Sequence, residues 1–232
     1  MFPQSQQSFT ATRASSALQN RVLRNTYWML AATMVPTVLG AWVGMSMGFS
    51  LFSGSPLISF LLFMGIAFAF FWGIERTKHS ITGVYLLLGF TFFMGLMLSR
   101  LLGVALGMGN GGQLVAVAAG GTGAIFFGMA SLSTVIKRDL TGMSKFLFIG
   151  VLLLILASVA NIWLQMPALM LTISVLAVGI FSVFLLVDLQ RIVNGGETNY
   201  ISATLAVYLS IYNIFSNLLV ILMSLFGGGS KE

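Results

Sequence analysis

The sequence predicts an all-α integral membrane protein, a bundle of seven transmembrane helices, and three observations favour this fold class. First, 58% of the 232 residues are hydrophobic and only 7% are charged, whereas about 25% of the residues of a soluble domain are charged. Second, the charges lie in short clusters, and each uncharged stretch between them can hold one or two spanning helices of about 20 residues. Third, turn-forming residues divide the two longest stretches. The uncharged stretches are 25–74, 79–99, 101–136, 146–187 and 198–230.

The chain begins with a segment, residues 1–24, that is rich in Gln and Ser. It has no apolar run of the length found in a signal peptide. We therefore expect a flexible cytoplasmic tail, and we expect the first apolar helix to act as an uncleaved insertion signal.

The helix boundaries follow from turn residues. Ser53-Gly54-Ser55-Pro56 separates the first two helices, Gly107–Gly112 the third and fourth, and Gln165-Met166-Pro167 the fifth and sixth, because Gly and Pro favour turns over helix interiors. The expected helices are 27–48, 57–74, 81–102, 113–135, 144–164, 168–190 and 201–225. They form one membrane domain, residues 25–226, which a short C-terminal tail, 227–232, follows.

The distribution of Lys and Arg predicts the orientation, because cytoplasmic loops retain positive charge. An N-terminus inside the cell places nine of these residues on the inner side and two on the outer side. The inner set is Arg13, Arg21, Arg24, Arg76, Lys78, Lys137, Arg138, Lys145 and Arg191, and the outer set is Arg100 and Lys231. We therefore expect an N-inside, C-outside topology, which also accounts for the net charge of +6 without a nucleic-acid partner.

The first helix carries Gly40, Gly44 and Gly48 at a spacing of four residues. This spacing places three positions without side chains on one face, where a neighbouring backbone can approach closely. We expect this face to pack inside the molecule, and a homodimer face is the alternative.

Asp188 is the acid of greatest interest, because ionisable groups within a bilayer are costly and often functional. It ends an uncharged run near the inner end of the sixth helix. One interpretation is a site for ions or gating, and the other is a structural ion pair with Arg191, one helical turn further on.

Ser210, Asn213 and Asn217 fall on one face of the seventh helix. This face either lines a polar path or forms hydrogen bonds to neighbouring helices. The candidate residues for an ion path or a gate are therefore Asp188, Arg191, Ser210 and Asn213.

The sequence shows no set of residues typical of catalysis, and we expect no enzyme, no metal site and no cofactor. It has no Cys and a single His, His79, so a thiolate or multi-histidine site is excluded. An intramembrane protease needs a histidine base or two facing carboxylates within the membrane, and neither is apparent here. H-E-x-x-H and P-loop motifs are also missing.

Three strings resemble the bacterial YccA-type proteins of the Bax inhibitor (transmembrane BAX inhibitor motif) family. They are Val22–Tyr27, Ala160–Leu169 and a third string that runs from Gly195–Tyr200 to Tyr208–Phe215. The resemblance covers nearly the whole chain after residue 20. It implies a multi-pass protein of the bacterial inner membrane, in which six helices surround a central seventh.

The resemblance also implies a function and a set of partners beside the lipid bilayer. Proteins of this type are substrates and modulators of the membrane protease FtsH, which grips a cytosolic N-terminal tail, and they associate with HflK and HflC. Residues 1–20 correspond to that tail. A non-enzymatic modulator of the FtsH complex is therefore the leading hypothesis.

The alternative hypothesis is a pH-sensitive calcium or cation leak channel, which is described for other members of the family. In those members two acids on the last two helices share a proton or a hydrogen bond. Asp188 matches the first of these positions, whereas Ser210 stands at the second. Because Ser210 does not titrate, the resemblance does not extend to a pair of acids. A purely structural membrane protein is the third interpretation.

Overall fold

A computed structural model describes residues 4–48 and 56–227 and confirms the seven-helix fold class. Every long element within these ranges is a helix, and seven of the helices are long and apolar enough to cross a membrane. Their bounds are α1 Gln4–Ser46, α2 Pro56–Thr77, α3 Ile81–Leu106, α4 Gly111–Val135, α5 Ser144–Leu164, α6 Pro167–Val193 and α7 Tyr200–Phe226. A short 3₁₀ turn, η1 Thr141–Met143, precedes α5.

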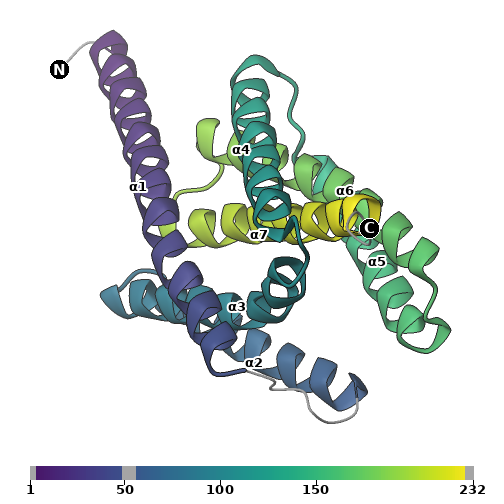
Figure 1. Cartoon of the computed structure of the whole chain (residues 1–232). Coiled ribbons are helices and arrows are strands. Elements are labelled where there is room, and N and C mark those ends of the chain that lie inside the picture. The colour runs from purple at the N-terminus through teal and green to yellow at the C-terminus, as the bar shows by residue number, and fades with distance from the viewer. Residues whose placement is uncertain (1–3, 49–55, 228–232) are drawn as a thin grey trace.

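Helix α7 lies at the centre of the bundle (Figure 1). It packs against α1, α2, α3, α4 and α6. The side chains Leu185 and Leu189 of α6, Val207 and Ile214 of α7 and Phe90 of α3 are fully buried around it. Helix α5 lies at the edge, where it packs against α6 and buries only Leu154. The remaining apolar surface of α5 is therefore available to lipid.

Helices α1 and α3 cross in close contact, because glycines on both helices remove the side chains between them. A Cβ atom added at Gly40 would overlap the carbonyl oxygen of Phe92, and one added at Gly95 would overlap the carbonyl oxygen of Thr37. A Cβ added at Gly44 would lie 2.5 Å from Oγ of Ser99. This reciprocal contact is the small-residue packing common between transmembrane helices.

Gly48 does not take part in this contact, contrary to the expectation from its spacing. It lies beyond the end of α1 at Ser46, and nothing lies within 4 Å of a Cβ added there. Its φ of +57° is the left-handed conformation that often ends a helix and that glycine adopts without strain. Gly48 therefore ends the helix rather than packing it.

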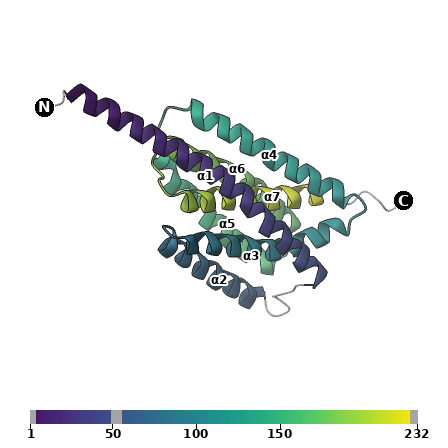
Figure 2. The same ribbon diagram turned by 90° about the vertical axis from the view of Figure 1, so that its left-hand side faces the viewer.

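Helix α1 begins at Gln4, far earlier than the expected start at residue 27. The segment for which a flexible tail is expected continues the helix, since it contains neither Gly nor Pro after Gln4. Figures 1 and 2 show this part of α1 extending beyond the ends of its neighbours. Every other helix end lies within four residues of its expected position. The division between the tail, residues 1–24, and the membrane domain stays a prediction.

Candidate functional site

Asp188 lies near the C-terminal end of α6 and is only partly buried, although its neighbours Val187 and Leu189 are fully buried. The ion pair with Arg191, one of the two interpretations of Asp188, does not form. Arg191 instead directs Nη2 to Oε2 of Glu197, at 3.9 Å, in the loop between α6 and α7. Within residues 19–48 and 57–227, no ion pair or side-chain hydrogen bond engages the Asp188 carboxylate.

The loop that follows α6 explains why Arg191 pairs with Glu197 and not with Asp188. Gly195 has a φ of +76°, and the N–H groups of Gly196 and Glu197 both donate to the carbonyl oxygen of Arg191, at 2.8 and 3.2 Å. This turn folds the loop back over the helix end and brings Glu197 to the Arg191 guanidinium. Among the described residues, the Asp188 carboxylate therefore has no ion-pair partner.

The polar side chains of α7 bond mainly within their own helix. Nδ2 of Asn213 donates to the carbonyl oxygen of Leu209 at 2.9 Å, and Nδ2 of Asn217 donates to that of Asn213 at 2.8 Å. Asn213 and Asn217 line a cavity of about 380 Å³ between α2, α3, α5, α6 and α7. Ser210 is buried, at 3% exposure, and does not line this cavity.

The four candidate residues for an ion path are therefore not gathered in one cavity. Asn213 lines the cavity, whereas Asp188 and Arg191 lie outside it. The described part of the chain also holds no group of three or more His, Cys, Asp or Glu side chains placed to bind a metal ion. The positions of these residues favour a structural role for the polar face of α7.

Sequence reasoning did not single out Gln190, whose amide side chain makes three hydrogen bonds at this end of the bundle. Its side chain is 2% exposed. Nε2 donates to the carbonyl oxygens of Ile136 and Arg138, both at 2.9 Å, and Oε1 accepts from the N–H of Leu140 at 2.9 Å. Gln190 therefore holds the basic loop between α4 and η1 against α6. A glutamine in the last turns of an apolar helix is the only signal for it in the sequence.

Asn199 makes a similar connection at the start of α7. Its Oδ1 accepts from the N–H groups of Ile201 and Ser202, at 2.9 and 3.1 Å, and so caps the helix. Its Nδ2 donates to the carbonyl oxygen of Lys78 in the loop between α2 and α3, at 2.7 Å. Two loops on the same end of the bundle are thus fixed by buried amide side chains.

Comparison with known proteins decides the family. A family model described as "Inhibitor of apoptosis-promoting Bax1" matches residues 19–227, which include all the spanning helices. The chain belongs to this Bax inhibitor family. The resemblance of its three strings to the family is thereby confirmed.

Relatives in this family match the chain over nearly its full length. An uncharacterised protein of Neisseria meningitidis is 38% identical over 92% of this chain and 95% of its own. The Escherichia coli K12 protein named "Modulator of FtsH protease YccA" is 35% identical over 90% of this chain and 93% of its own. A relative from another Escherichia coli strain is named "Inner membrane protein YccA" and matches to the same extent. As a member of the Bax inhibitor family with seven apolar helices, the chain is a multi-pass inner-membrane protein.

Proposed function

We propose that this protein is a non-enzymatic modulator of an FtsH-type membrane protease. The observation that carries the proposal is the match to the Escherichia coli modulator, which extends over 93% of that protein at 35% identity. Such a match covers 90% of this chain, so most of its helices and loops have a counterpart in that protein. The proposal extends to HflK and HflC as further members of the same assembly.

The N-terminal part of α1 is the segment that supports this function best. An apolar stretch long enough to cross a membrane lies within Gln19–Ser46 of α1, whereas the helix itself begins at Gln4. The intervening residues extend past the bundle (Figure 2). In the proposed N-inside orientation they project into the cytoplasm, where a membrane-anchored protease engages the ends of its substrates.

A truncation tests the proposal. Full-length protein, a version without residues 1–20 and a control version without residues 228–232 are each produced with FtsH in inner-membrane vesicles. We expect the full-length protein and the control to co-purify with FtsH and to slow the degradation of a second membrane substrate. We expect the version without residues 1–20 to do neither. Equal inhibition and equal co-purification of all three versions would show that the N-terminal segment is not the contact.

A channel is the second candidate function. The observation that favours it is the Asp188 carboxylate, which has no ion-pair partner among the described residues. A carboxylate in a spanning helix without an ion-pair partner is a suitable ligand for a hard cation such as Ca²⁺. The purified protein in liposomes should then pass Ca²⁺ at a rate that Asp188→Asn changes, with Glu75→Gln, an exposed acid, as the matched control. Absence of Ca²⁺ flux at any pH would remove this candidate.

A further inference from the structure

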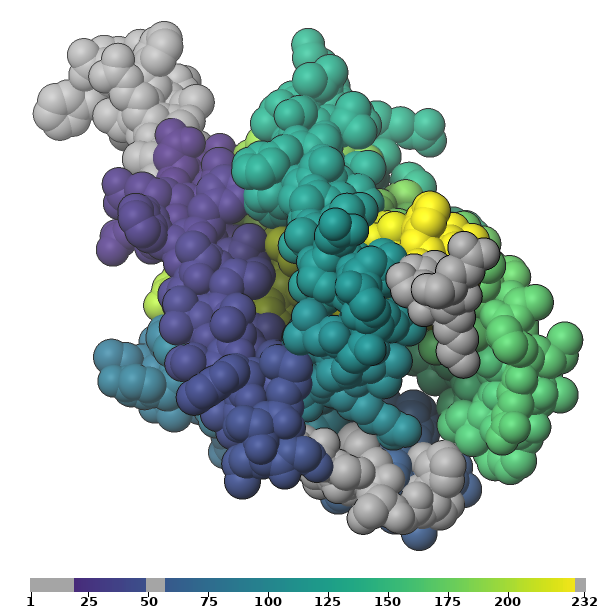
Figure 3. All heavy atoms as spheres, viewed as in Figure 1, coloured from purple at the N-terminus to yellow at the C-terminus, as the bar shows by residue number. Residues whose placement is uncertain are grey.

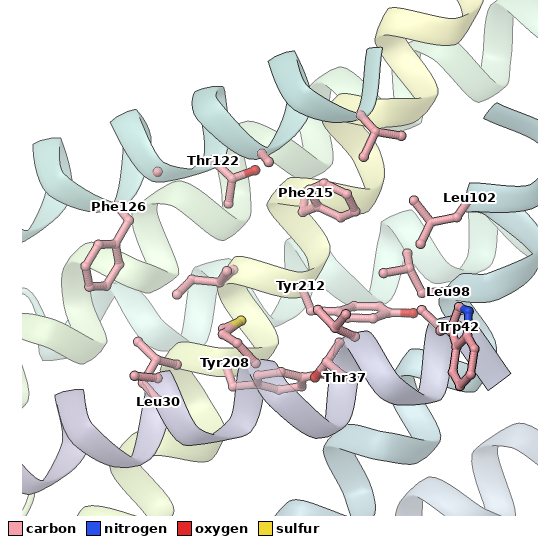
Figure 4. A pocket seen from close by; sticks show the side chains of 18 of the residues that line it. Leu30, Thr37, Trp42, Leu98, Leu102, Thr122, Phe126, Tyr208, Tyr212 and Phe215 are labelled. Atoms are coloured by element: carbon pink, nitrogen blue, oxygen red, sulfur yellow. The ribbon is translucent and has the colours of Figure 1, made fainter. Parts of the chain in front are cut away.

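A groove of about 1050 Å³ lies between α1 and α4, with α7 at its base. Helices α1 and α4 both pack against α7 but diverge from each other, so the groove opens sideways. Figure 3 shows α7 in the depth of a hollow between these two helices. In Figure 4, Thr122 and Phe126 of α4 face Leu30 and Thr37 of α1 across the groove. The rim includes Val38 and Phe127, which are 66% and 70% exposed. The groove therefore opens toward the surroundings of the helices, which are the lipid chains.

The groove is apolar, and four of the hydroxyl groups on its walls, those of Thr37, Thr122, Tyr208 and Tyr212, already have hydrogen-bond partners. Tyr208 bonds to Thr37 at 2.9 Å, and Tyr212 donates to the carbonyl oxygen of Met94 at 3.2 Å. Oγ1 of Thr122 donates to the carbonyl oxygen of Ala118 at 2.7 Å. Since these groups need no further hydrogen bond, the walls offer little to water or to an ion. The walls of the groove therefore favour an apolar ligand.

The length of the groove suits an acyl chain. The lining of the groove extends along α1 from Tyr27 to Met45, a rise of about 27 Å at 1.5 Å per residue. An acyl chain reaches across one leaflet, or about 15 Å, and fits within this length.

The charges at one end of the groove favour an anionic headgroup. Just before Tyr27, α1 carries the exposed residues Arg21 and Arg24, and just after α4 the chain carries the exposed residues Lys137 and Arg138. Tyr27 and Phe126 lie at this end of the groove and make an edge-to-face contact, with ring centroids 6.2 Å apart. None of the four cations forms an ion pair with an acid in the described part of the chain. The acid beside them, Asp139, bonds to the N–H of Thr141.

We propose that the groove between α1 and α4 binds an anionic phospholipid, with an acyl chain along α7 and the phosphate among Arg21, Arg24, Lys137 and Arg138. Apolar burial holds the acyl chain, and the basic residues select the headgroup, because Lys and Arg side chains near the membrane surface attract anionic lipids. The site rests on the groove and its charges alone. It does not depend on the proposed action on a protease.

Native mass spectrometry of the delipidated full chain tests the site, with added phosphatidylglycerol and phosphatidylcholine of identical acyl chains. Gly123→Phe fills the groove, because Gly123 lines it and nothing lies within 4 Å of a Cβ added there. Gly120→Phe is the matched control, since Gly120 is on the same helix, is equally unobstructed and lies outside the lining. Ala119→Phe, also in the lining, replaces Gly123→Phe if that variant does not fold.

We expect the full chain and Gly120→Phe to bind phosphatidylglycerol at least fivefold more tightly than phosphatidylcholine, and Gly123→Phe to bind both at least fivefold more weakly. A variant in which Arg21, Arg24, Lys137 and Arg138 are all replaced by Gln should lose the preference for phosphatidylglycerol. It should bind both lipids with the affinity that the full chain has for phosphatidylcholine. Equal binding of the two lipids by the full chain would overturn the proposal. A dimer that Gly123→Phe dissociates would also overturn it, because the groove would then hold a second copy of the chain.

Discussion

The hydroxyl groups of Thr37 and Tyr208 lie 2.9 Å apart and join α1 to α7 in the interior of the membrane domain. Tyr208 is 1% exposed and Thr37 is 9% exposed. Because the Thr37 hydroxyl donates to the carbonyl oxygen of Thr33 at 2.8 Å, the phenol of Tyr208 donates to Thr37. This is a hydrogen bond between helices that are separated by most of the chain, and it fixes the first helix against the central one.

Removal of this hydrogen bond should destabilise the protein measurably. We expect Tyr208→Phe to lower the free energy of unfolding by about 0.5–1.5 kcal/mol, the range for a single hydrogen bond, with the lower part of that range typical in membranes. Reversible unfolding in mixed micelles measures it, and a double-mutant cycle with Thr37→Val isolates the pair. Strictly additive effects of the two substitutions would show that the bond contributes nothing.

The close crossing of α1 and α3 leads to a second prediction. Gly40→Ala places a methyl group on the carbonyl oxygen of Phe92, so the helices must move apart, and we expect a loss of about 1–3 kcal/mol. Gly65→Ala on α2 is the control, because nothing lies within 4 Å of its added Cβ and alanine favours helix. Unfolding in mixed micelles should show Gly65→Ala at or above the stability of the unmodified protein. Equal stability of the two variants would contradict the close crossing.

The number of helices and most of their ends could be predicted from the sequence. The length of the apolar stretches and the turn residues around Pro56 and Pro167 determine the number of helices and their ends. These are local features, which a single sequence is enough to identify. The start of α1 could not be predicted from the sequence. No glycine or proline separates the tail from the first spanning helix, so the helix continues through Arg24. Sequence composition alone does not distinguish a polar helix from a polar coil in such a segment.

The contacts of the candidate residues depend on long-range geometry and were predicted less well. The spacing of Gly40 and Gly44 indicates a close approach but does not name α3 as the partner. The partner of Arg191 depends on the turn at Gly195, which brings Glu197 back to the helix end. Gln190 bonds to Ile136, which lies 54 residues away in the sequence, and only the folded bundle brings the two together.

Asp139 gives a prediction about pH. The hydrogen bonds from the side chain and the backbone N–H of Thr141 lower the pKa of the exposed Asp139 carboxyl below its ordinary value of 3.8. Because the pKa of Asp139 is lower in the folded state, these bonds stabilise the protein at pH values above the pKa of the unfolded state. This contribution is lost as the pH falls through the pKa of the folded state. Thr141→Val should raise this pKa toward its ordinary value in a carboxyl ¹³C NMR titration, whereas Thr134→Val, in the preceding helix, should not. An unchanged titration in Thr141→Val would exclude the side chain as the cause.

Gln190 gives a prediction about the basic loop that it holds. Gln190→Leu removes both donations to the carbonyl oxygens of Ile136 and Arg138 and leaves the N–H of Leu140 without its acceptor. Each unsatisfied group costs about 1–3 kcal/mol, so local opening and trypsin cleavage after Lys137 should become about tenfold faster or more. Gln190→Glu keeps the acceptor for Leu140 and loses the donors, so its cleavage rate should be intermediate. Gln113→Leu, at an exposed position of α4, is the control and should be cleaved as slowly as the unmodified protein. The Gln190 amide is the only side chain of α6 with hydrogen bonds to the described backbone of residues 136–140. If Gln190→Leu is cleaved no faster than Gln113→Leu, contacts other than this amide hold the loop.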